Sequence, residues 1–106
     1  MKRLVDRLQR HNIVCKKLTP LLPKELGSRK RIDLYFGTDT LGYYCSVMVL
    51  EKKSRVLRKE AEELKRLHTK MEAYVGSAIT KKYAWMEAPL CSKAKAWMEA
   101  EGWVFL

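Results

Sequence analysis

The sequence has little of what marks secreted, membrane or disulfide-rich proteins. Its 106 residues contain three isolated cysteines and no Cys-x-x-Cys pair. An odd number of separate cysteines argues against a disulfide framework and predicts buried, reduced thiols. No apolar run approaches the roughly 18 residues that a membrane span needs. The N-terminus is basic and amphipathic without an apolar core segment, so we expect no signal peptide, no membrane contact and a cytoplasmic location.

Several kinds of catalytic site are missing as well. The sequence has no glycine-rich phosphate loop, no serine-nucleophile turn and no zinc-ligand spacing. Its two histidines, His11 and His68, are far apart and have no cysteine at ligand spacing. His68 borders the apolar face of a predicted helix, where we expect it to pack.

What the chain has in excess is positive charge, and this charge is unevenly distributed. The net charge is +10. Residues 1–32 contribute +8, residues 33–51 contribute −3, residues 52–82 contribute +6 and residues 83–106 contribute −1. A basic protein with an acidic middle suits a phosphate-binding surface around a metal site, and a general need for solubility would produce the same excess.

Hydrophobic periodicity predicts a mixed α/β (α+β) fold in one domain, residues 1–106. The expected order is helix, three strands, helix, strand, helix, strand, which implies a mixed sheet with an antiparallel hairpin and helices on both faces. The expected helices are residues 2–10, residues 52–75 and a helix between Ser92, as its N-cap, and Gly102. The expected strands are residues 13–15, 30–37 and 43–51, a strand around Tyr83 and Trp85, and residues 103–106. Pro20, Pro23 and Gly27 predict a loop after the first strand.

One group of residues points to chemistry. Asp33 lies inside an apolar run, and Glu51 and Lys53 form a Glu-x-Lys sequence at the end of the next apolar run. An acid on one strand and Glu-x-Lys at the exit of the next can place two carboxylates and an amine at one sheet edge. Such a group suits a divalent metal ion held against a phosphodiester.

With the order of elements, Asp33 and Glu51-Lys52-Lys53 resemble the PD-(D/E)xK, or restriction-endonuclease-like, nuclease superfamily. Its small members include archaeal Holliday-junction resolvases and RecB-like nuclease domains, and the resemblance of pattern covers about residues 1–106. It implies that Asp33 and Glu51 bind Mg²⁺ or Mn²⁺ and that Lys53 orients or activates the attacking water. The implied activity is metal-dependent, endonuclease-like hydrolysis of DNA, by a homodimer if the analogy with small nucleases extends to assembly. Asp6 on the first helix is a further candidate acid.

The resemblance also implies that basic side chains contact the nucleic-acid backbone independently of sequence. These residues are Arg3, Arg7, Arg10, Arg29, Lys30, Arg31, Arg55, Arg58 and Lys59. The chain departs from the family pattern in having Ile32 before the first acid, Lys52 at the middle of Glu-x-Lys, and no following Gln-x-x-x-Tyr.

The hairpin between the two acids presents a geometric difficulty. A turn over residues 39–42 places Asp33 opposite Met48, three residues and roughly 10 Å along the strand from Glu51. A bulge at Gly37 or an asymmetric loop is then needed for the two acids to share a metal.

Two other functions remain open from the sequence. One is a basic nucleic-acid-binding protein on the same scaffold without catalysis, in which Asp33 is an ordinary strand acid and Glu51-Lys52-Lys53 a charged helix start. The other is a small homo-oligomeric interaction module, in which the apolar seam from Leu57 to Tyr74 is the contact between copies.

Overall fold

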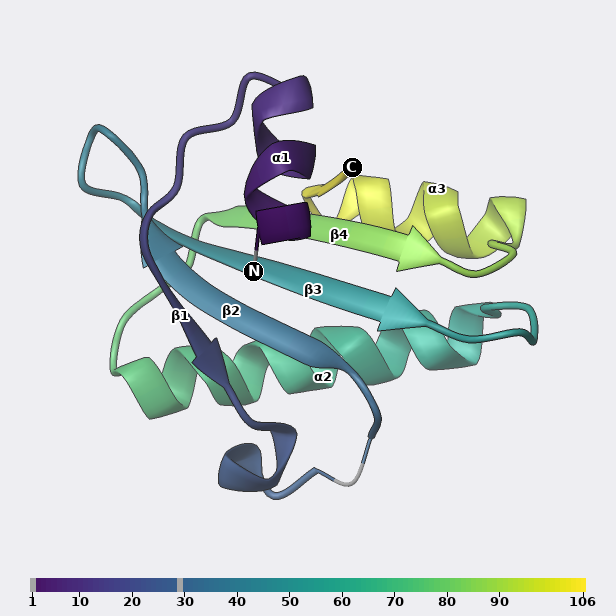
Figure 1. Ribbon diagram of the computed structural model, residues 1–106. Coiled ribbons are helices and arrows are strands. Elements are labelled where there is room, and N and C mark those ends of the chain that lie inside the picture. Colours follow the sequence, from purple (N-terminus) through teal and green to yellow (C-terminus); the bar gives the residue numbers. More distant parts are fainter. Residues whose placement is uncertain (1, 29) are drawn as a thin grey trace.

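A computed structural model describes residues 2–28 and 30–106, and it contains the mixed sheet with helices on both faces that the periodicity predicts (Figure 1). The helices are α1 (Lys2–Arg10), α2 (Arg58–Val75) and α3 (Ser92–Ala100), with a 3₁₀ helix η1 (Pro23–Leu26). The strands are β1 (Lys16–Leu21), β2 (Asp33–Thr38), β3 (Tyr44–Glu51), β4 (Lys81–Glu87) and β5 (Trp103–Phe105). No described helix is long and apolar enough to cross a bilayer.

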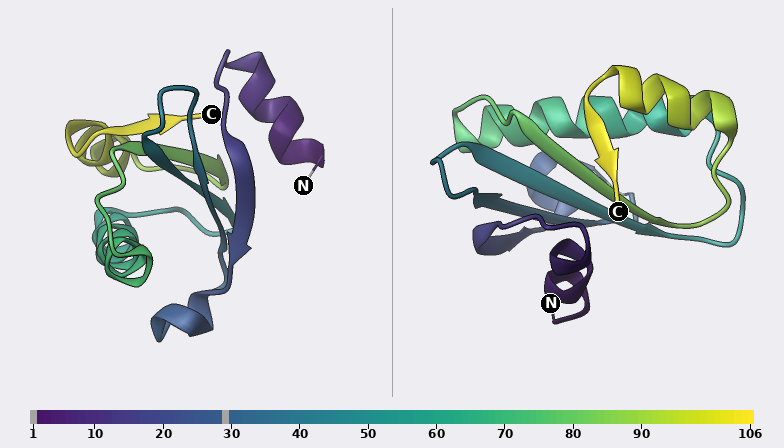
Figure 2. Two further views of the ribbon diagram at one scale, coloured as in Figure 1. Left: turned by 90° about the vertical axis from the view of Figure 1, so that its left-hand side faces the viewer. Right: turned by 90° about the horizontal axis from the view of Figure 1, so that it is seen from above.

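The five strands lie side by side in chain order, β1-β2-β3-β4-β5. The pairs β1–β2 and β2–β3 are antiparallel, whereas β3–β4 and β4–β5 are parallel. Helices α2 and α3 form the two crossovers between parallel strands. Figure 2 shows both of them on one side of the sheet and α1 on the other.

A separate apolar core lies on each face of the sheet. On one face, buried side chains of α2 such as Leu64 and Met71 pack against Met48 of β3. On the other face, Leu4 and Leu8 of α1 pack on the strands in a smaller cluster. Strand β3 is apolar on both sides because it contributes to both cores, as expected for a central strand.

The first strand lies later in the chain than predicted. Residues 13–15 precede β1, and Pro20, which we expected in a loop, lies within the strand. Proline is tolerated there because β1 is an edge strand, where an outward N–H has no partner in the sheet. Most of β1 is exposed, so it lacks the apolar alternation by which strands are recognised.

The predicted starts of two helices are also corrected. Helix α2 begins at Arg58 rather than at residue 52. Within the connection before it, Val56 is fully buried and forms an isolated bridge with Leu90, and its N–H donates to the carbonyl oxygen of Pro89 at 2.8 Å. Cys91 rather than Ser92 is the N-cap of α3.

Candidate functional site

The turn between β2 and β3 decides which residues of β2 face α1. The N–H of Gly42 donates to the carbonyl oxygen of Asp39 at 3.2 Å, and the N–H of Asp39 donates to the carbonyl oxygen of Tyr43 at 2.9 Å. Gly42 has a φ of 85°, so the turn closes with a glycine bulge that sets two residues, Gly42 and Tyr43, opposite Asp39. Asp39 Oδ1 accepts hydrogen bonds from the N–H groups of Leu41 and Tyr43, both at 2.9 Å, and holds the turn.

This bulge changes the pairing predicted for Asp33. Asp33 lies opposite Val49 instead of Met48, and the pairing of β2 with β3 is unbroken. Of the two ways in which the offset could be reduced, the asymmetric loop occurs and the bulge at Gly37 does not. Because side chains alternate along a strand, Asp33, Val49 and Glu51 now share one face of the sheet. The remaining offset between the two acids is two residues rather than three.

Both acids line a pocket at the edge of the sheet beneath α1, which we name the strand-end pocket. Asp33 begins β2 and Glu51 ends β3, and both are exposed. The pocket has a volume of about 190 Å³. Its lining consists of Arg3, Leu4, Asp33, Tyr35, Val49, Glu51, Trp85 and Glu87.

Glu87 is a third acid of this pocket that the sequence analysis did not select. It ends β4 and pairs directly with Glu51 at the end of β3. Arg3 Nη2 donates to Glu87 Oε1 at 2.9 Å, so one of the two neighbouring carboxylates is already bound to a cation. The signal was present in the sequence, because the ends of adjacent parallel strands meet at the same edge of a sheet.

Two arginines of α1 lie over one aromatic ring beside the pocket. The guanidinium carbons of Arg3 and Arg7 are 5.2 and 5.1 Å from the centre of the buried Trp85 ring. Arg7 also donates through Nη2 to the carbonyl oxygen of Leu106 at 3.1 Å. These contacts hold both arginines in place next to the acids, as cation–π geometry favours.

The same arginines continue into a groove along α1. The groove has a volume of about 210 Å³ and is lined by Arg3, Asp6, Arg7, Arg10, Trp85 and Glu87. Asp6, the additional candidate acid, lies in this groove and outside the lining of the strand-end pocket. The predicted contact residues Arg3, Arg7 and Arg10 therefore gather on one surface.

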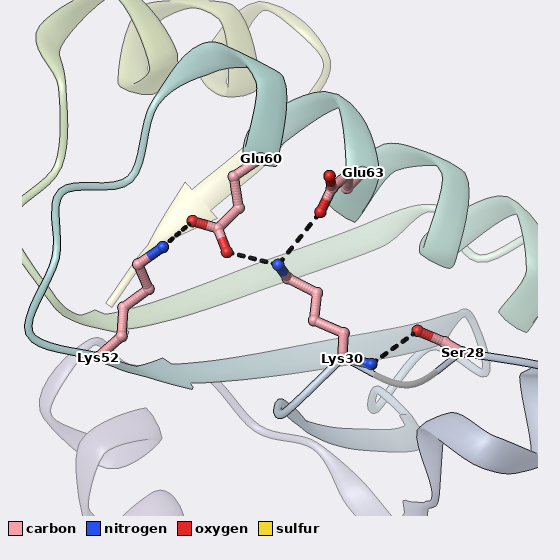
Figure 3. A network of polar contacts seen from close by, with 5 residues as sticks. All are labelled: Ser28, Lys30, Lys52, Glu60 and Glu63. Carbon is pink, nitrogen blue, oxygen red and sulfur yellow. Dashed lines mark hydrogen bonds and ion pairs between the residues drawn. The ribbon is translucent and has the colours of Figure 1, made fainter.

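None of the lysines near the acids lines the strand-end pocket. Lys53 is exposed just beyond β3 and lies outside the lining of the strand-end pocket. Lys52 points to the opposite face, where its Nζ lies 2.5 Å from Glu60 Oε1 of α2. Lys30 binds the other oxygen of Glu60 and lies 3.3 Å from Glu63, as Figure 3 shows.

Glu60 therefore has the partners that a carboxylate on an apolar helix face requires. Burial opposes its ionisation, but the hydrogen bonds and charges of Lys30 and Lys52 outweigh burial and hold the pKa of Glu60 below its usual value. The ammonium group of Lys30 is thus paired with two carboxylates of α2.

The other basic residues expected to bind nucleic acid are divided between the surroundings of the two acids and the start of α2. Arg31 lines a second hollow that also includes Asp33 and Glu51. Arg58 lies 3.6 Å from Glu62 and stands over the ring of Trp97. Arg55 and Lys59 are exposed near the start of α2, and Arg29 lies outside the described residues.

Within residues 2–28 and 30–106, no three His, Cys, Asp or Glu side chains form a group that could hold a metal ion. The carboxylates of the strand-end pocket thus supply fewer ligands than a site made of protein alone requires. They match the pattern of Mg²⁺, which keeps several waters and uses one or two carboxylates together with substrate phosphates.

The apolar seam of α2 packs mainly inside the molecule. Leu64, Leu67 and Met71 are buried against the sheet, whereas Leu57 and Tyr74 at its ends are exposed. The seam is therefore part of the core and leaves only its two ends for contact with another copy.

Comparison with known proteins shows that the fold is similar to solved structures of EndoMS and of a repair endonuclease. No family model and no curated protein sequence matches the chain. Among solved structures, EndoMS in its apo form superposes with a TM-score of 0.58 at 16% identity, over 98% of this chain and 44% of EndoMS. A repair endonuclease from Pyrococcus abyssi has a TM-score of 0.55 at 17% identity, over 99% of this chain and 43% of that protein. EndoMS in a complex with double-stranded DNA has a TM-score of 0.54 at 16% identity, over 98% of this chain and 42% of that one. The chain spans less than half the length of each of these proteins.

Proposed function

We propose that this chain is a metal-dependent endonuclease domain that hydrolyses DNA phosphodiesters. The observation that carries the proposal is that Asp33 and Glu51, from neighbouring antiparallel strands, share one face and line one pocket beside the arginines of α1. The similarity of the fold to EndoMS and to a repair endonuclease from Pyrococcus abyssi supports this function.

Asp33 and Glu51 would hold the metal ion. Hard divalent cations such as Mg²⁺ and Mn²⁺ prefer carboxylate oxygens, and these are the donor atoms that the two residues bring to the pocket. When bound, the ion polarises a phosphoryl oxygen and lowers the pKa of bound water. Glu87, on the strand next to Glu51, raises the negative charge of the pocket and strengthens its attraction for a cation.

The remaining residues would bind and orient the DNA. Arg3, Arg7 and Arg10 present positive charge along the groove that adjoins the acids, which suits contacts with backbone phosphates. Lys53, exposed beyond the end of β3, would turn towards the scissile phosphate, offset its charge and orient the attacking water. Assembly into a homodimer would allow two such sites to reach both strands of a duplex.

A nucleic-acid-binding protein without catalysis is the second candidate. Two observations favour it. Arg3 forms an ion pair with Glu87, and no three of the described ligating side chains form a group that could hold a metal ion. In that case the arginine groove binds the DNA backbone while Asp33 and Glu51 serve only to shape the surface.

Cleavage of supercoiled plasmid in the presence of Mg²⁺ or Mn²⁺ separates the two candidates. We expect the full chain to nick the plasmid, and we expect Asp33→Asn, Glu51→Gln and Lys53→Ala each to abolish nicking while binding to a labelled duplex persists. Glu99→Gln and Lys70→Ala, which remove exposed charges from α3 and α2, are the matched controls and should cleave normally.

Binding that falls steeply with salt, without nicking under either metal, would identify the non-catalytic protein. Light scattering of the same preparation, with and without a duplex, reports whether the chain forms a dimer.

A further inference from the structure

Two of the three cysteines meet although they are far apart in the sequence. Cys15 and Cys45 are separated by 30 positions, yet their Sγ atoms lie 3.0 Å apart. Cys45, near the start of β3, is completely buried, whereas Cys15, just before β1, is only partly covered. Cys91 packs against the core on the other face of the sheet, so it is not a partner of this pair.

Gly37 explains how the two thiols come together. It lies on β2 directly opposite Cys45, and a Cβ at this position would lie 2.7 Å from the carbonyl oxygen of Lys16. The backbone at Lys16 therefore passes close over Gly37, and the register of β1 shifts immediately afterwards. This close passage brings the preceding residue, Cys15, over β2 to the side chain of Cys45.

The two thiols differ in accessibility and in acidity. The hydrogen bond with Cys45 lowers the pKa of Cys15, against the effect of burial. The same hydrogen bond, together with burial, raises the pKa of Cys45. A thiolate is the reacting form of cysteine, so the partly exposed Cys15 is the better nucleophile and the buried Cys45 is placed to resolve the product.

We propose that Cys15 and Cys45 form a dithiol site that exchanges with small organic disulfides such as glutathione disulfide and closes into an intramolecular disulfide. The Cys15 thiolate attacks one sulfur of the small disulfide, forms a mixed disulfide and releases the first thiolate. The sulfur of Cys45 then attacks Cys15 Sγ, its proton passes to a thiolate, and the second small thiol leaves. Two electrons move from the protein to the small disulfide, and two small thiols are produced.

Closing this bond would fix the segment that carries α1. Cys15 packs in the same cluster as Leu4 and Leu8, the residues by which α1 is attached to the sheet. The disulfide would join the end of the α1–β1 connection to the central strand β3. It would also remove conformational freedom from a 30-residue loop of the unfolded chain, which stabilises the native state.

The test uses the full chain with Cys91→Ser, which leaves only the proposed pair. After the folded, reduced protein is treated with glutathione disulfide, we expect an intact mass about 2 Da below that of the reduced chain, as formation of one disulfide requires. Peptide mapping should recover Cys15 linked to Cys45, and the melting temperature should rise by roughly 10 °C relative to the reduced protein.

Single-cysteine variants in the same background test the assigned roles. Cys45→Ser should stop at a stable glutathione adduct on Cys15, and Cys15→Ser should stay unmodified while folded because Cys45 is buried. A Cys91→Ser chain that keeps one glutathione without a linked peptide, or that forms only disulfide-linked dimers, would overturn the proposal. If Cys45→Ser does not fold, Cys15→Ser and the linked peptide of the parent chain decide the question.

Discussion

Glu51 and Glu87 lie directly opposite each other at the ends of the parallel strands β3 and β4. Like charges in this arrangement repel, and Arg3 reduces the repulsion by binding Glu87. Because the side chain of Arg3 is largely exposed, the metal ion and the DNA phosphate of the proposed function would each compete for one member of this ion pair. The Arg3–Glu87 ion pair therefore links the positive charge of α1 to the negative charge of the strand-end pocket.

Arg3→Ala should strengthen Mn²⁺ binding by the pocket. The substitution removes a cation that competes for Glu87, and a single exposed ion pair corresponds to a change in dissociation constant of roughly 2- to 5-fold. Titration calorimetry measures the constant directly. In a Glu87→Gln background, Arg3→Ala should have little further effect, and weaker Mn²⁺ binding by Arg3→Ala alone would contradict this account.

Glu60→Gln should destabilise the fold by about 2 kcal/mol at neutral pH, because Lys30 and Lys52 lose a partner in a partly buried location. The pKa of Glu60 is lowered by folding, so its contribution is present above the pKa of the unfolded chain and is lost as the pH falls through the folded value. Urea unfolding at several pH values between about pH 7 and pH 3 measures this contribution. The free energy of unfolding should fall less with decreasing pH in Glu60→Gln than in the wild type.

Glu62→Gln is the matched control for Glu60→Gln on the same helix. Among the residues that the structure describes, Glu62 pairs only with exposed Arg58, so its substitution should change the free energy of unfolding by less than about 0.5 kcal/mol. Equal effects of the two substitutions would show that the contacts of Glu60 with Lys30 and Lys52 contribute no more to the free energy of unfolding than one exposed ion pair does.

His68 should make the fold sensitive to mild acid. Burial, opposed by Glu72 and assisted by Lys82, lowers the pKa of His68 to about 4. The unfolded chain therefore binds a proton first, and the free energy of unfolding should fall by roughly 3 kcal/mol between about pH 6.5 and pH 4. Denaturant unfolding of His68→Gln should lack this component, whereas exposed His11→Gln should retain it.

Gly37→Ala should destabilise the protein by about 1–3 kcal/mol, because the added Cβ would overlap the backbone of Lys16 and β1 would have to move. Gly27→Ala is a useful comparison. Nothing lies within 4 Å of a Cβ at Gly27, so its cost comes only from its φ of 73° and should be about 1 kcal/mol. Thermal unfolding of both variants measures the difference, and a smaller effect at Gly37 would argue against the close passage of β1.

The order of elements could be predicted because apolar residues recur with helical and strand periods in most of them. The periodicity did not reveal β1, whose residues are mostly exposed and include Pro20. It also extended α2 too far towards its N-terminus, since buried Val56 continues the apolar pattern while its backbone pairs with another segment.

The two acids of the candidate site could be selected from the sequence, but their relative positions could not be predicted from it. Asp33 and Glu51 stand out in the sequence, whereas their placement on one face depends on a hydrogen-bonding pattern at Gly42 that periodicity does not encode. The position of Glu87 beside Glu51 depends on the parallel pairing of β3 with β4. Its bond to Arg3 joins residues 84 positions apart and depends on where α1 packs on the sheet. The partners of Lys30 likewise lie on α2, far along the chain.

The bulge at Gly42 takes up the odd residue of the hairpin within the turn, so the pairing of β2 with β3 is unbroken. A residue added or removed between Thr38 and Tyr44 must likewise be absorbed by the turn if Asp33 is to stay opposite Val49. If the pairing slipped by one position instead, every side chain of β2 would move to the opposite face and Asp33 would point towards α2. The buried Leu34 opposes that slip, because it packs in the core on the α2 face. Insertions in this loop should therefore reshape the turn and leave the two acids on one face of the sheet.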